Sequence, residues 1–160
     1  MRLMIAAIGK TRSGPLSDLS ADYLARAQRD GRNLGFTGPD LMEFEAPRGL
    51  SGAKRQTSES ALLMGAAPPS ANLIRLDERG KAYTSEDFAA LLGKWRDEGV
   101  NTAAFFIGGA DGYDKVLREK APFSISFGAA TWPHMLVRVM LAEQIYRAMT
   151  ILSGHPYHRS

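Results

Sequence analysis

Short apolar runs alternate with helical patterns along the chain. The runs span residues 3–8, 41–44, 71–76, 103–107 and 123–127, and the second is the weakest. Glycine directly follows the first, fourth and fifth runs. Short apolar runs that end at glycine are typical of strands covered on both faces. We therefore expect five strands in the interior of the protein.

Helical spacing of apolar residues occupies the gaps between these runs. We expect helices over residues 17–29 and 53–64, and a third that Thr84 caps and that buries Phe88 and Trp95. The last helix should begin at Pro133 and end near residue 152, and residues 113–120 form two turns at most. The alternation predicts the α/β class, a mostly parallel sheet flanked by helices, in a single domain over residues 1–160.

Length and composition agree with one globular domain. The chain has 160 residues, of which 44% are hydrophobic and 23% charged, so a disordered or fibrous protein is excluded. No apolar run approaches the roughly 18 residues of a membrane-spanning helix. The first apolar stretch also lacks the cleavage site of a signal peptide. We expect a cytoplasmic protein that makes no contact with a membrane.

Residue counts exclude several chemistries. With no cysteine, the chain has no disulfide, no thiolate metal site and no cysteine nucleophile, and its three histidines make a metal centre improbable. Twenty Lys and Arg residues against 17 Asp and Glu give a net charge of +3, which permits nucleic-acid binding without requiring it.

Three glycine-containing loops follow expected strands in the second half of the chain, at residues 76–81, 107–112 and 127–132. Ligands of open α/β sheets bind beyond the carboxyl ends of the strands, and glycine lets the backbone approach a flat ligand closely. Each glycine alone is equally consistent with an ordinary turn. Three such loops together favour a ligand pocket.

Common nucleotide and hydrolase motifs are missing. Gly9-Lys10-Thr11 resembles the end of a phosphate loop, but Met4 stands where that motif needs glycine. The glycines from Gly108 to Gly112 are not in the register of a dinucleotide fingerprint, and neither a Gly-x-Ser-x-Gly elbow nor a His-Glu-x-x-His pair occurs.

Polar residues suited to catalysis concentrate at the carboxyl end. Two of the three histidines fall in the last six residues, beside a tyrosine and an arginine. A solvated tail with incidental histidines is the alternative. His134, directly after Pro133, is interpreted as a capping or packing residue, and Arg138 is equally consistent with an ion pair at an interface.

Five segments of the sequence carry a family resemblance: residues 76–81, 106–112, 131–139, 142–148 and the His-Pro-Tyr-His-Arg ending at 155–159. With them the whole chain resembles the bacterial ribosomal RNA large-subunit pseudouridine N3-methyltransferase family, part of the knotted SPOUT superfamily. The resemblance implies a SPOUT fold with a C-terminal trefoil knot. It also implies S-adenosylmethionine as cofactor, no metal, and a homodimer whose sites lie near the interface.

The resemblance also assigns residues to roles. The implied reaction is methyl transfer to N3 of a pseudouridine in a stem-loop of 23S ribosomal RNA, with the ribosomal particle as partner. Phe127-Gly128 stands where the family commonly has Leu-Ser, so only backbone contacts to the cofactor are expected there. The implied cofactor contacts are Leu76, Gly108, Gly109, Phe127, Gly128, Ala129, Ala130, Thr131 and Trp132.

The same resemblance places the catalytic groups in the tail. His158 is our hypothesis for the base that removes the N3 proton, because imidazole titrates near neutrality. Tyr157 would position the base or stack on it. Arg159 and Arg138 would hold phosphate or counter the charge on the pyrimidine oxygens, and His155 would contact the RNA.

Two other functions stay open. A Rossmann-like oxidoreductase could use Glu45 as its ribose-binding acid, but it lacks the glycine fingerprint after the first strand. A non-catalytic, ribosome-associated RNA-binding module would have no need of a base in its tail. Titration with S-adenosylmethionine separates both from a methyltransferase.

Overall fold

The computed structural model describes residues 1–158, which form a five-stranded, all-parallel sheet with the order β2-β1-β4-β3-β5. The strands are β1 (Arg2–Ile8), β2 (Thr37–Phe44), β3 (Asn72–Ala82), β4 (Thr102–Ile107) and β5 (Phe123–Ser126). The helices are α1 (Pro15–Gly31), α2 (Gly52–Ala66), α3 (Ser85–Asp97), α4 (Lys115–Lys120) and α5 (His134–Ser153), with short 3₁₀ turns at Arg32–Leu34 and Pro156–His158.

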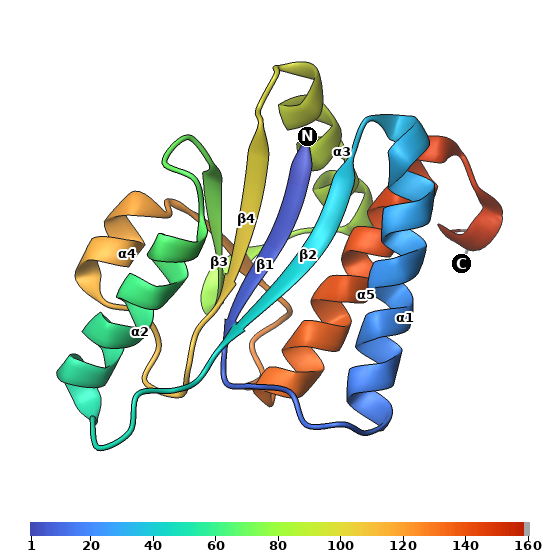
Figure 1. Cartoon of the computed structure of the whole chain (residues 1–160). Coiled ribbons are helices and arrows are strands. Elements are labelled where there is room, and N and C mark those ends of the chain that lie inside the picture. The colour runs from blue at the N-terminus through green and yellow to red at the C-terminus, as the bar shows by residue number, and fades with distance from the viewer. Residues whose placement is uncertain (159–160) are drawn as a thin grey trace.

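Helices cover both faces of the sheet, as the alternation predicts. Helices α1, α3 and α5 lie on one face, and α2 and α4 lie on the other (Figure 1). Odd-numbered residues of β1 such as Leu3 and Ile5 pack into the first layer, whereas Met4 and Ala6 pack into the second. Since successive side chains of a strand point to opposite faces, a strand buried on both sides must be apolar throughout.

Two strands are longer than the sequence predicts. Strand β2 begins at Thr37 and not at 41: it is an edge strand, and its first four residues, Thr-Gly-Pro-Asp, form no apolar run. Strand β3 continues past Leu76 to Ala82: it pairs with β5 up to Leu76, bulges, and pairs again at Lys81. At the bulge, a side chain on Gly80 would meet the backbone of Ile125 at 2.8 Å, so glycine is required there.

The helices agree with expectation within two residues. The Thr84 side chain accepts a hydrogen bond from the amide of Asp87 at 3.0 Å and caps α3. Pro133 lies at the N-cap position, directly before the first residue of α5. Gly154 ends that helix in the left-handed conformation with φ 70°. None of the helices within residues 1–158 is long and apolar enough to cross a membrane.

Candidate active site

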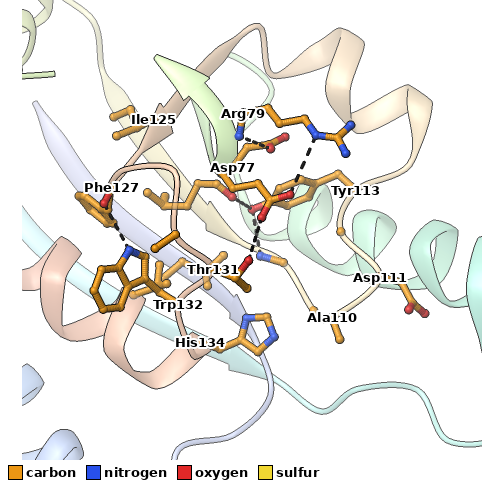
Figure 2. A pocket seen from close by; sticks show the side chains of 18 of the residues that line it. Asp77, Arg79, Ala110, Asp111, Tyr113, Ile125, Phe127, Thr131, Trp132 and His134 are labelled. Carbon is orange, nitrogen blue, oxygen red and sulfur yellow. Dashed lines mark hydrogen bonds and ion pairs between the residues drawn. The ribbon is translucent and has the colours of Figure 1, made fainter. Parts of the chain in front are cut away.

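The three late strand-end loops meet in one pocket at the carboxyl edge of the sheet (Figure 2). The cavity measures about 330 Å³, within the usual range of roughly 300–1,000 Å³ for small-molecule sites. Eight of the nine residues predicted to contact a cofactor line it, and Ala129 does not. Those eight are Leu76, Gly108, Gly109, Phe127, Gly128, Ala130, Thr131 and Trp132.

Tyr113 joins two of these loops from inside the protein. Its hydroxyl accepts a hydrogen bond from the Gly108 amide at 2.9 Å and lies 2.9 Å from the Leu76 carbonyl oxygen and 2.7 Å from that of Phe106. Burial raises the pKa of this phenol, so it stays protonated and can donate. A side chain on Gly108 would meet the Tyr113 ring at 2.9 Å. The sequence pattern places Tyr113 at a short helix and gives no sign of this role.

Charged groups of the β3 bulge form one wall. Asp77 accepts from the backbone amide of Arg79 at 3.1 Å and lies 3.3 Å from the Arg118 guanidinium. Glu78 accepts from the Thr131 hydroxyl at 3.3 Å, which ties the bulge to the loop before α5 (Figure 2). These contacts fix the relative position of the first and third loops.

The backbone of the third loop is held by the side chains of Ser126 and Trp132. The Ser126 hydroxyl donates to a carbonyl oxygen, with those of Glu78 at 3.0 Å and Gly128 at 2.9 Å in range, and accepts from the Gly128 amide at 3.1 Å. The Trp132 indole donates to the Phe127 carbonyl at 3.3 Å, yet Trp132 remains 42% exposed at the pocket. The backbone of this loop therefore keeps its shape with glycine at 128.

Helix α2 supports the middle loop from behind. The Glu59 side chain is 2% exposed, its Oε2 has no hydrogen-bond partner among the described residues, and it fills the space that a side chain on Gly109 would need. Burial raises the pKa of Glu59, and the nearby Arg55 opposes that effect. Arg55 lies 2.7 Å from Asp111, which lines the pocket. No sequence motif marks Glu59 as part of the site.

Arg138 is a predicted site residue whose charged side chain lies in the protein interior. It is 4% exposed, and its guanidinium donates to the carbonyls of Ile8 at 2.8 Å and Gly9 at 2.5 Å and pairs with Glu43 at 2.5 Å. These contacts join α5 to the ends of β1 and β2, so the structure favours a positioning role for Arg138. A contact between Arg138 and RNA stays a prediction.

His134, interpreted above as a capping or packing residue, faces the pocket at the start of α5 (Figure 2). Burial, and secondarily the positive charge of Arg138, lower its pKa. The imidazole is therefore neutral at pH 7 and presents one donor and one acceptor to the cavity.

The carboxyl-terminal residues lie away from the pocket of their own chain. Tyr157 packs on Tyr146, with ring centroids 4.7 Å apart, and its hydroxyl donates to Glu143 at 3.4 Å. Tyr146 is twelve residues along α5 from His134, about 18 Å at 1.5 Å per residue. Figure 1 shows this segment beside the opposite end of α5 from the pocket. His155 is exposed in the same segment, the His158 side chain is not described, and Arg159 lies outside the described residues.

The pocket suits a cofactor such as S-adenosylmethionine. Ile107, Ile125 and Val137 offer apolar surface to a flat base, and the polar groups of the β3 bulge and the middle loop lie around it. Gly108 and Gly109 let the middle loop pack directly against Tyr113 and Glu59, since a side chain at either would displace one of these buried neighbours. Binding by these residues stays a prediction.

A parallel sheet with a pocket at the ends of its last three strands defines a ligand-binding α/β protein. It is not a dinucleotide fold of the usual kind, in which the ligand loop follows the first strand; Glu45, the alternative ribose acid, is exposed and lies 3.2 Å from Lys10. Residues 1–158 match the family described as predicted SPOUT methyltransferases, and the chain belongs to this family.

Relatives of known name resemble the chain along its whole length. A protein of Rhodopseudomonas palustris strain HaA2 named ribosomal RNA large subunit methyltransferase H is 52% identical over 160 residues, with 100% of both chains covered. Proteins of the same name from Nitrobacter winogradskyi and Bradyrhizobium sp. strain ORS 278 are 51% and 50% identical, with 99% or more of each chain covered. The resemblance noted from the residues is confirmed, whereas the trefoil knot stays a prediction.

Proposed function

We propose that this protein methylates N3 of a pseudouridine in 23S ribosomal RNA, with S-adenosylmethionine as the methyl donor. The observation that carries the proposal is the meeting of three strand-end loops in one pocket, in a chain about half identical to relatives named as ribosomal RNA methyltransferases. Because the substrate is ribosomal, we place the activity in the cytoplasm, on the ribosomal particle.

The chemistry needs alignment and one proton transfer. S-adenosylmethionine, when bound, supplies a methyl group on a positively charged sulfur, already activated for transfer. The protein must hold the acceptor nitrogen in line with that methyl group, and positioning of this kind lowers a barrier substantially. The acceptor N3 exchanges an N–H bond for an N–C bond, so a base must take its proton.

We assign that base to His158, with Tyr157 and Arg159 beside it and His155 at the RNA. Burial, followed by contact with Tyr23, raises the pKa of Tyr157, so its hydroxyl stays protonated near neutral pH. Tyr157 therefore acts as a hydrogen-bond donor or a stacking surface, and the proton goes to the histidine.

A second copy of the chain is needed to bring tail and pocket together. In one chain, Tyr157 packs near the end of α5 that lies farther from the pocket. The exposed Trp132 leaves large apolar surface uncovered beside the cavity. We propose a homodimer in which the tail of one protomer completes the pocket of its partner.

The test is incubation with methyl-labelled S-adenosylmethionine and ribosomal particles that lack the modification, followed by mass mapping of the RNA. We expect one labelled methyl on a pseudouridine of 23S RNA, at N3. Cofactor binding without methyl transfer would favour the non-catalytic module, and methylation of a different base would contradict the assigned substrate.

A further inference from the structure

Two loops extend the pocket surface along the carboxyl edge of the sheet. They comprise residues 9–14 after β1 and residues 45–55 after β2, the latter including the first turn of α2, and we call them together the loop rim. Figure 1 shows both loops at the edge where the strands end, the edge that also carries the pocket. The rim contains no part of the pocket lining.

Hydrogen bonds connect the loop rim with the pocket. The Gly9 amide donates to the Phe44 carbonyl at 2.7 Å, which holds the two loops side by side. At the other end, the Gly52 amide donates to Asp111 at 3.1 Å. Asp111 lines the pocket. A polymeric ligand that leaves the pocket at this wall would therefore pass directly onto the loop rim.

The rim carries the positive charge of the molecule. It contains one acid, Glu45, and five cations, which gives a net charge of +4, whereas the whole chain carries +3. The remainder of the protein is therefore slightly acidic, and its modest overall charge conceals a local excess. The five cations are Lys10, Arg12, Arg48, Lys54 and Arg55.

Three of these cations have no ion-pair partner among the described residues. Lys10 pairs with Glu45 at 3.2 Å, and Arg55 pairs with Asp111. Arg12, Arg48 and Lys54 are exposed, and none forms an ion pair with any residue from 1 to 158. Their loops contain no acid from 10 to 14 or from 46 to 54. A run of unneutralised cations beside a pocket raises the local concentration of an anionic partner.

We propose that the loop rim binds the phosphate backbone of the RNA that flanks the target nucleotide, through Arg12, Arg48 and Lys54. This inference rests on the proposed function, because a nucleotide held in the pocket must continue into a polyanionic strand on the surface next to it. Contacts from Lys and Arg to phosphate position a nucleic acid without reading its sequence. The rim therefore supplies affinity and register, while the pocket and the tail supply the chemistry.

The test compares two triple variants in the full-length protein. Arg12→Gln/Arg48→Gln/Lys54→Gln neutralises the rim, and Arg32→Gln/Lys94→Gln/Lys120→Gln makes the same charge change near the opposite edge of the sheet. Binding of a fluorescent 23S RNA stem-loop is measured by anisotropy over a series of salt concentrations. Methyl transfer to ribosomal particles and calorimetric binding of S-adenosylmethionine are measured in parallel.

We expect the rim variant to bind the stem-loop about tenfold or more weakly, with a salt slope reduced by roughly two to three, since each lost phosphate contact removes slightly less than one. KM for ribosomal particles should rise while kcat and cofactor affinity are kept, and the control variant should match the wild type. Equal affinity and slope for the rim variant would overturn the inference. A change in its oligomeric mass would also overturn it, in favour of a contact between copies.

The two proposals fail in different ways. Wild-type protein that binds no S-adenosylmethionine and transfers no methyl group contradicts the proposed function, whatever the rim variant does. Wild-type protein that methylates normally, with a rim variant that binds RNA equally well, contradicts the rim inference alone.

Discussion

Gly108 occupies a position where the missing side chain is a structural requirement. The Tyr113 ring occupies the space that a Cβ on Gly108 would need. The Tyr113 hydroxyl also accepts a hydrogen bond from the Gly108 amide. One residue thus controls both the space in the pocket and the hydrogen bond between two loops. The predicted contact with a cofactor at Gly108 depends on both.

Gly108→Val should abolish binding of S-adenosylmethionine. Two methyl groups and a Cβ would displace the Tyr113 ring and separate the loops after β3 and β4, so calorimetry should show at least a hundredfold loss of affinity, about 3 kcal/mol. Gly65→Ala is the control, because a side chain there meets nothing within 4 Å and Gly65 lies inside α2. Near-normal cofactor binding by Gly108→Val would place the cofactor elsewhere.

At the scale of elements, Arg138 connects helix α5 to the sheet. It pairs with Glu43 of β2 and donates to the last carbonyls of β1, so it holds the start of α5 over the strand ends. His134 and Val137, which line the pocket, lie on the same turns of α5. The geometry of the third pocket wall therefore depends on a buried ion pair.

Arg138→Ala should destabilise the fold and leave the cations of the loop rim unchanged. Removing one member of a buried pair typically costs about 3–5 kcal/mol, because the other charge stays buried. Urea unfolding measures this loss. Arg26→Ala is the control: Arg26 forms an exposed pair with Asp22 on α1, and such surface pairs contribute little to stability. A stable Arg138→Ala protein with weakened RNA binding would support the phosphate role of Arg138.

Helix α2 carries a buried carboxylate whose ionisation opposes folding. The pKa of Glu59 lies above its usual 4.5 in the folded protein, mainly because of burial. The folded state therefore holds a proton that the unfolded state has released, and the stability falls as pH rises through the interval between the two pKa values. Above that interval Glu59 is ionised in both states, and its buried carboxylate is less stable in the folded protein than in the solvated, unfolded chain.

Glu59→Gln should consequently be more stable than the wild type at neutral pH. The amide resembles the protonated acid and cannot ionise, so the advantage should grow as the pH rises above the usual carboxyl pKa and disappear at the acid end. Chemical unfolding at a series of pH values from acid to neutral measures it. A variant that is less stable at every pH would mean that attraction to Arg55 outweighs desolvation.

The elements themselves show how far sequence patterns reach. Apolar runs that end at glycine located three strand ends, those of β1, β4 and β5, to within one residue, because such runs depend on local sequence only. The second half of β3 was not predicted, because residues 77–81 are charged or glycine and are held in place by pairing with β5. The roles of Tyr113 and Glu59 were not predicted either. They depend on contacts with residues distant in sequence, and no pattern in the neighbouring residues indicates them.

At the scale of the whole molecule, the pocket and the tail mark opposite ends of α5. Residue patterns predicted the pocket loops and the polar tail, and the family resemblance gave each a role. No pattern in the sequence indicates the distance between the pocket and the tail. The fold separates Tyr157 from the pocket because α5 is 20 residues long, about 30 Å. Two copies in which each tail approaches the pocket of its partner account for both features.

Mixing two inactive variants measures this arrangement directly. His158→Ala keeps the pocket and loses the base, whereas Gly108→Val loses the pocket and keeps the base. Each alone should transfer labelled methyl groups to 23S RNA at least tenfold more slowly than the wild type. After unfolding and refolding together, a mixed dimer has one site with an intact pocket and an intact tail, so the mixture should regain up to about a quarter of wild-type activity. This estimate assumes random pairing into two-fold dimers. A mixture as inactive as its components, alongside an active wild type, would contradict a site shared between two chains.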